Sequence, residues 1–210
     1  MRQSVSGKPS LTAYVVEDDD DMREAVGDLL ALSGHDVALY ADAAHFLEEV
    51  PEPRGVLVVD LRLKGMSGLR LQQKVMGNAM LAIIFISGVA DIQDSVEAMK
   101  AGALDFLVKP VRAQILIDAV AAGMERVSQV HRADARHSAF RAGYEMLTEA
   151  EREIAGFVAM GWRNKQIANK TGKTENTVKV HRARMLKKME AGSPFELMTQ
   201  LKAIGVLADP

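Results

Sequence analysis

The stretch "VVEDDDD", Val15 to Asp21, decides how the first part of this chain folds, because an apolar run passes directly into five consecutive carboxylates. A short apolar run of this kind is typical of a buried β-strand. The last three aspartates fit the start of a following helix, where the helix dipole stabilises acids. Glu17 and Asp18 are then left at the end of the strand. Closely packed like charges raise one another's pKa, so we expect a cation to offset them.

Short apolar runs and helical patterns alternate from this stretch to Val127. The expected strands are residues 11–16, 36–40, 55–60, 81–87 and 105–110, and the expected helices are residues 20–32, 42–49, 69–76, 91–101 and a segment from about 112. The third and fourth runs are almost continuously apolar, as are strands buried on both faces. This alternation predicts an α/β, doubly wound, five-stranded parallel sheet of the flavodoxin-like kind, with strand order 2-1-3-4-5.

Polar residues stand at the carboxyl ends of four expected strands: Glu17 with Asp18, then Asp60, Ser87 and Lys109. Each residue alone would more often be an ordinary turn or surface residue, but carboxyl ends of parallel strands meet at one edge of a sheet. Clustered carboxylate oxygens suit Mg²⁺, which would relieve their repulsion. With a lysine and a hydroxyl alongside, an aspartate can accept a phosphoryl group as an aspartyl-phosphate.

The first 127 residues resemble the CheY-like receiver domain of two-component response regulators, through "VVEDD", "VVDLRLKGMSG", "FISG" and "AGALDFLVKP". The resemblance implies that a histidine kinase phosphorylates Asp60. It also implies that Mg²⁺ is bound by Asp18, Asp60 and the backbone carbonyl of Arg62, with Glu17 acting through water.

The same resemblance assigns residues that respond to the phosphoryl group. It implies that Ser87 is the switch hydroxyl, that Phe106 is the switch aromatic, and that a cis bond before Pro110 directs Lys109. For Phe106, plain packing of an aromatic on an edge strand is the alternative. The chain departs from the family at Lys64, where proline is usual, and this departure adds a cation near the site.

The helical pattern continues past Val127 and becomes polar in "QVHRADARHSAFRAGYE", so we expect a helical linker over residues 128–145. A small all-α domain of four helices is expected over residues 146–210. Thr148 and Glu151 fit a capping box at the start of its first helix. Gly161 and Gly172 are typical of helix ends.

Residues 163–188 contain nine Lys and Arg and one acid. Two short helices separated by a turn at Gly172 have helix-turn-helix spacing. The second of these, expected over residues 175–190, has one apolar face and one basic face. Solvated surfaces normally mix charges of both signs, so the near absence of acids favours DNA binding. The basic face would enter the major groove, and the surrounding cations would bind phosphates.

The segment from "LTEAEREI" to "TVKVHRARMLKKM", and on to about Leu201, resembles the LuxR-type helix-turn-helix of the NarL/FixJ subfamily. Position by position, the resemblance implies that Lys179 and Val180 face the bases. The further DNA-binding candidates, some of which could instead serve helix packing, are Lys165, Thr174, Asn176, Thr177, His181, Arg182, Arg184 and Lys188. We expect His181 to fix helix geometry and Trp162 to pack at a helix end.

Composition limits the remaining possibilities. The chain has no cysteine, which excludes disulfides and thiolate sites and fits a reducing compartment. We expect a cytoplasmic protein without a membrane partner, because there is no apolar leader and the longest apolar run, residues 79–86, is too short to span a bilayer. Residues 1–146 carry a balance of −6 and residues 147–210 one of +4, which predicts two domains with different partners.

These observations predict a DNA-binding response regulator. A kinase phosphohistidine would donate to Asp60, and the phosphorylated protein would form a homodimer through residues 91–110 or its first helix. The dimer would bind a two-fold operator, and activation of transcription would bring in RNA polymerase.

Two rival functions fit the residues less well. An aspartyl-phosphate phosphatase needs a second aspartate two residues after its nucleophile, and Arg62 stands there, so we do not expect an enzyme. Alternatively, the helical domain of a receiver protein could bind a protein partner, but the single sign of charge over residues 165–188 argues against this.

Overall fold

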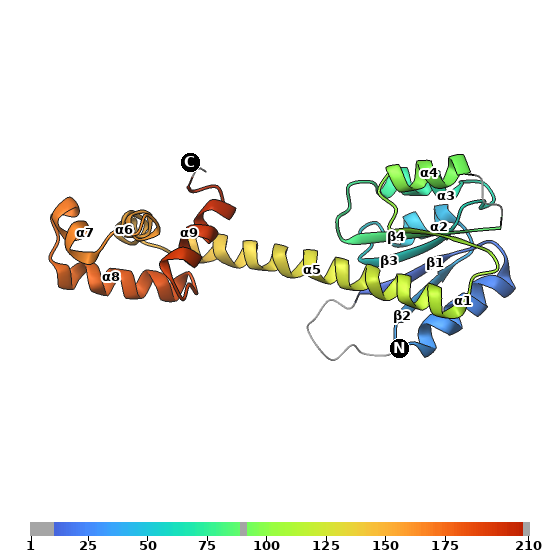
Figure 1. Cartoon of the computed structure of the whole chain (residues 1–210), viewed down its shortest axis with the longest axis horizontal. Helices are drawn as coiled ribbons and strands as arrows, with labels where there is room; N and C mark the ends of the chain where they lie inside the picture. The colour runs from blue at the N-terminus through green and yellow to red at the C-terminus, as the bar shows by residue number, and fades with distance from the viewer. Residues whose placement is uncertain (1–10, 89–91, 208–210) are drawn as a thin grey trace. The chain divides into compact units, whose positions relative to one another are not determined.

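The computed structural model describes residues 11–88 and 92–207, in which the chain divides into two compact units between His131 and Arg132. The first unit has a five-stranded parallel sheet in the order β2-β1-β3-β4-β5, as predicted (Figure 1). The strands are β1 Thr12–Val16, β2 Asp36–Tyr40, β3 Gly55–Asp60, β4 Leu81–Ser87 and β5 Asp105–Val108.

Helices follow the strands in alternation, and the last of them continues into the second unit: α1 Asp20–Leu32, α2 Ala43–Glu49, α3 Gly68–Val75, α4 Ile92–Lys100 and α5 Ala113–Glu145. Their bounds lie close to those expected, although the expected start of the fourth helix at Asp91 falls outside the described residues. The side chain of Asp19 accepts a hydrogen bond from the amide of Met22 and caps α1, while Asp20 and Asp21 lie in its first turn. As expected, the last three acids of the opening stretch lie at the start of α1, and Glu17 and Asp18 remain at the end of β1.

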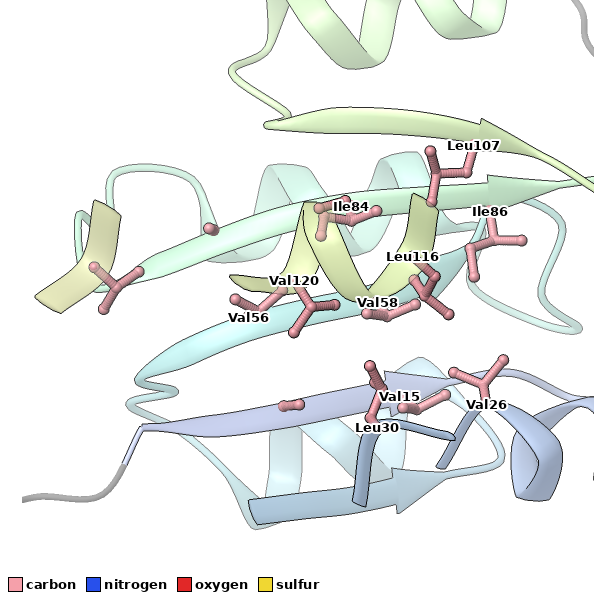
Figure 2. Close-up of a cluster of buried hydrophobic side chains, with 14 residues drawn as sticks. Val15, Val26, Leu30, Val56, Val58, Ile84, Ile86, Leu107, Leu116 and Val120 are labelled. Atoms are coloured by element: carbon pink, nitrogen blue, oxygen red, sulfur yellow. The ribbon is translucent and has the colours of Figure 1, made fainter. Parts of the chain in front are cut away.

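Both faces of the sheet are covered. Helices α1 and α5 pack on one face, where Figure 2 shows Leu30 beside Val15 and Leu116 beside Val58. Helices α2, α3 and α4 pack on the other through Phe46, Leu71 and Ala98. Each fully buried Val, Leu, Ile, Phe or Met side chain contributes about 1.5–3 kcal/mol relative to exposure. This double burial explains why β3 and β4 are apolar almost throughout.

The strand register brings the expected site residues to one edge. β1 lies beside β3 with Val16 opposite Val59, so the residues that follow β1 are next to Asp60 at the end of β3. Ser87 at the end of β4 pairs with Val108, the residue before Lys109.

The second unit consists of four further helices, α6 Glu149–Ala159, α7 Asn164–Thr171, α8 Glu175–Lys188 and α9 Pro194–Ala203, together with the end of α5. They share a core that includes Ile154, Ile167, Met185 and Leu197. The capping box of Thr148 and Glu151 is present.

The turn between α7 and α8 depends on Gly172, whose φ of 67° is a left-handed conformation that glycine adopts without strain. The expected linker, residues 128–145, is helical because it continues α5 as far as Glu145. In residues 11–88 and 92–207, no helix is long and apolar enough to cross a membrane.

Candidate functional site

Three carboxylates meet at the carboxyl edge of the sheet. Glu17, Asp18 and Asp60 each offer an oxygen within 4.8 Å of the others, although the first two follow β1 and the third ends β3. Glu17 is buried, and the other two are half-buried. Hard oxygens at this spacing have the chemistry that Mg²⁺ requires, so these residues fit the metal expected from the sequence.

Lys109 supplies the cation that the opening stretch demands. Its Nζ lies 2.7 Å from Oε2 of Glu17 and 2.6 Å from Oδ2 of Asp60. The peptide bond between Lys109 and Pro110 is cis, as expected. The residue that follows β5 therefore offsets part of the negative charge of the acids that follow β1 and end β3.

Burial and hydrogen bonding shift the pKa values of Glu17 and Lys109 in opposite directions. Burial raises the pKa of Glu17, and the neighbouring Asp60 adds to the rise, while the hydrogen bond from Lys109 opposes it. For Lys109, burial alone would lower the pKa, but its hydrogen bonds to Asp60 and Glu17 together outweigh burial and raise it. Lys109 therefore keeps its charge at neutral pH and holds the site together electrostatically.

The loop after β3 adds two contacts. The backbone amide of Arg62 donates to Oδ1 of Asp60 at 2.9 Å and fixes the orientation of that carboxylate. Nζ of Lys64 lies 3.1 Å from Oδ2 of Asp18. The sequence places Lys64 near the site, but this specific pairing does not follow from any pattern.

Ser87 and Phe106 lie at the same edge. Ser87 is fully buried, and its carbonyl accepts a hydrogen bond of 2.8 Å from the amide of Lys109. Phe106 is half-buried, with its ring centroid 6.3 Å from that of Phe85. The packing expected as the alternative role of Phe106 is therefore present, and it leaves the switch role open.

Gly68 is a residue that the sequence did not single out. It begins α3, and a Cβ at this position would lie 2.5 Å from the carbonyl oxygen of Asp60 and 3.0 Å from Cε1 of Phe85. Only glycine lets α3 approach the end of β3 so closely. It is one of two glycines close together after β3, and nothing in a single sequence distinguishes it from Gly65.

The second unit presents a basic surface on α7 and α8. Val178 and Met185 of α8 are buried in the core. The side chains on the opposite side of α8, together with one on α7, are exposed: Lys165, Asn176, Lys179, Val180 and Arg184. A helix with an exposed basic side and a packed apolar side suits the major groove.

Some DNA-binding candidates also have partners inside the unit. Nζ of Lys188 lies 2.7 Å from Oε2 of the buried Glu151, so the packing alternative for this lysine is supported. Nη1 of Arg182 donates to Oδ1 of Asn164 at 3.1 Å and ties α8 to α7. These contacts join α8 to α6 and α7, so both side chains are bonded within the unit instead of extending into solvent.

Thr174 caps a helix, and His181 and Trp162 pack within the unit. The side chain of Thr174 accepts from the amide of Thr177 and caps α8. His181 is half-buried, and its Nδ1 is buried without a partner among the described residues, which agrees with a role in packing. Trp162 lies against Phe157 with centroids 4.8 Å apart, at the end of α6 as expected.

Comparison with known families matches both units. The family described as "Response regulator receiver domain" matches residues 13–121, and the family described as "Bacterial regulatory proteins, luxR family" matches residues 145–200.

Similar proteins share this arrangement over nearly their whole length. Nodulation protein W of Bradyrhizobium diazoefficiens is 38% identical over 93% of this chain and 87% of its own. Transcriptional regulatory protein FixJ of Azorhizobium caulinodans is 38% identical over 94% of each chain. Among solved structures, the response regulator StyR has a TM-score of 0.78 and 36% identity, over 92% of this chain and 98% of its own.

Proposed function

Because the chain belongs to the NarL/FixJ subfamily of response regulators, which join a receiver to a LuxR-type DNA-binding domain, we propose that phosphorylation of Asp60 controls its binding to DNA. The protein is a phosphorylation-controlled DNA-binding regulator, and its two domains imply a histidine kinase and DNA as partners. Proteins with this pair of domains are typically regulators rather than enzymes. We keep residues 128–145 as the linker between the two.

The observation that carries the assignment of Asp60 is its place between Lys109 and the amide of Arg62. A carboxylate oxygen of Asp60 forms the new O–P bond while the N–P bond of the donor phosphohistidine breaks. Lys109 offers its positive charge to the transferred group.

Asp18, Asp60 and the backbone carbonyl of Arg62 would hold Mg²⁺, with Glu17 acting through water, and the metal would supply further positive charge to the phosphoryl oxygens. Ser87 and Phe106 are the residues that we propose respond to the modification. Both lie at the edge of the sheet that carries Asp60, and Ser87 is joined to Lys109 through the backbone.

The second domain is the part of the protein that is proposed to bind DNA. Lys179 and Val180 are proposed to face bases, since both are exposed on α8. The neighbouring cations, including Lys165 and Arg184, are proposed to bind phosphates and to give a salt-dependent affinity.

Phosphorylation is proposed to cause dimerisation, so that two such domains bind a two-fold operator. The described part of α4 supports one of the two expected surfaces, because Ile92 is 78% exposed and Val96 and Met99 are also exposed. Apolar side chains gathered on one surface helix are typical of a protein interface. Contact with RNA polymerase remains part of the proposal for an activator.

Intact-mass spectrometry tests the acceptor. Incubation with acetyl phosphate and Mg²⁺ should add one acid-labile phosphoryl group, and EDTA or Asp60→Asn should prevent it. Asp36→Asn is the matched control, because Asp36 begins β2 at the opposite edge of the sheet. The same adduct in Asp60→Asn would show that another residue is the acceptor.

A further inference from the structure

The acid cluster of the receiver contains a second cation besides Lys109. Lys109 pairs with Glu17 and Asp60, whereas Asp18 pairs with Lys64 at 3.1 Å. Each of the three carboxylates therefore faces an ammonium group.

The two lysines are held very differently. The side chain of Lys109 is 23% exposed and lies between two carboxylates. The side chain of Lys64 is 86% exposed and reaches one carboxylate from a tight turn, in which the amide of Met66 donates to the carbonyl of Lys64. A solvated pair of this kind shifts an equilibrium by at most about fivefold, so it is easily displaced.

We infer that Lys64 competes with Mg²⁺ for Asp18 and so weakens metal binding at the acid cluster, an inference that rests on the proposed function. Mg²⁺ held by Asp18 would be bonded to a carboxylate oxygen of that residue. An ammonium held on the same carboxylate would then be a like charge beside a divalent cation. Metal binding therefore requires Lys64 to leave Asp18 for solvent, which its flexible side chain permits.

The consequence is a dependence of phosphorylation on Mg²⁺ concentration. While Lys64 occupies Asp18, two ammonium groups offset all but one of the three negative charges without metal, and more Mg²⁺ is needed to fill the site. Mg²⁺ cannot displace Lys109 as easily, because Lys109 is bound by two carboxylates and is partly buried.

Direct metal binding to the full-length protein tests the inference. Free Mn²⁺ is measured by electron paramagnetic resonance, and the Kd for Mg²⁺ follows from displacement of Mn²⁺. Lys64→Met should lower that Kd by about two- to fivefold, while Lys64→Arg, which keeps the charge, should stay close to wild type. Unchanged or weaker binding in Lys64→Met would overturn the inference.

Lys74→Met is the matched control for net charge. Lys74 is exposed on α3 and makes no ion pair with another described residue. It should leave the Kd close to the wild-type value. Equal tightening in Lys74→Met and Lys64→Met would reveal a general effect of charge and overturn a specific competition for Asp18.

Asp18→Asn separates this inference from the proposed function. It should abolish Mg²⁺ binding in both the wild-type and the Lys64→Met background. If Asp18→Asn binds Mg²⁺ normally, or if the wild-type protein binds none, the proposed metal site is wrong and the inference falls with it. If Asp18→Asn loses the metal but Lys64→Met leaves the Kd unchanged, only the inference fails.

Discussion

Gly68 shows how a residue without a functional group can shape the phosphorylation site. Gly68→Ala should lower the free energy of unfolding of the receiver by about 1–3 kcal/mol, because its Cβ would meet the carbonyl oxygen of Asp60 at 2.5 Å. Protection of the β1 and β3 amides from hydrogen exchange measures this loss.

Gly156→Ala is the control for the substitution itself. Gly156 lies within α6, and a Cβ there would meet nothing within 4 Å, so its domain should not lose stability. Unchanged protection of β1 and β3 in Gly68→Ala would mean that α3 can shift at little cost.

At the scale of residues, the sequence predicts which side chains form the site better than it predicts which of them pair with one another. The acids and the lysine of the site can be predicted, because strand ends are predictable and parallel strands end together. The bond between Lys64 and Asp18 could not be, because a long side chain on a surface loop has many rotamers of similar energy. The need for Gly68 comes from the distance between α3 and β3, which no local pattern encodes.

The elements of the second domain are held by a buried acid. Glu151 caps α6 at Thr148 and also accepts from Lys188 at the end of α8. The hydrogen bond from Lys188 lowers the pKa of Glu151 below its usual 4.5, against the opposing effect of burial. The stabilisation is therefore complete above about pH 4.5 and is lost as the pH falls through the lowered pKa of the folded state.

Glu151→Gln should remove that pH dependence and lower the free energy of unfolding at pH 7 by about 1.5–3 kcal/mol. Fluorescence of Trp162, the single tryptophan, reports this domain during urea denaturation at each pH. Glu149→Gln, at an exposed first-turn acid, should have a smaller effect. Equal losses in the two variants would remove Lys188 as the cause.

Helix α8 should separate base contacts from phosphate contacts. Lys179→Ala should weaken specific binding by about 1–3 kcal/mol and relax base preference, since a groove contact discriminates between sequences. Lys165→Ala on α7 should weaken binding to all sequences about equally. Electrophoretic shifts with operator and random duplexes measure both, and an equal loss on the two duplexes for Lys179→Ala would reassign it to the backbone.

At the scale of elements, the sequence predicts most of the structure. Strands and helices are predicted closely because period, caps and turn glycines agree, as at Asp19 and Gly172. What the pattern could not decide was which of the basic residues on α7 and α8 face outward. Lys188 and Arg182 have partners inside the domain, Glu151 and Asn164, which come from other helices.

For the whole molecule, we expect dimerisation to be the switch. The alternative is masking, in which the acidic receiver would cover the basic DNA-binding domain until it is phosphorylated. Tethering two DNA-binding domains makes the second contact intramolecular and raises affinity without new contacts. The phosphorylated protein should therefore double its mass from 22.9 kDa in light scattering. A truncation beginning near Ala139 should bind DNA poorly.

The opposite balances of charge, −6 and +4, motivate the masking alternative. Under masking, the truncation would bind DNA tightly without any phosphorylation. A phosphorylated protein that stays monomeric, together with a truncation that does not bind, would contradict both routes.

The hydrogen bond between Lys109 and Glu17 joins residues 92 positions apart. During synthesis the ribosome adds about 5–20 residues per second, so the acids appear seconds before their cation. A growing chain that has reached only β4 has its acceptor aspartate but not the lysine that holds it. We therefore expect a kinase to meet a complete acceptor site only on receivers in which Lys109 has emerged, and fragments that end before Lys109 should not be phosphorylated.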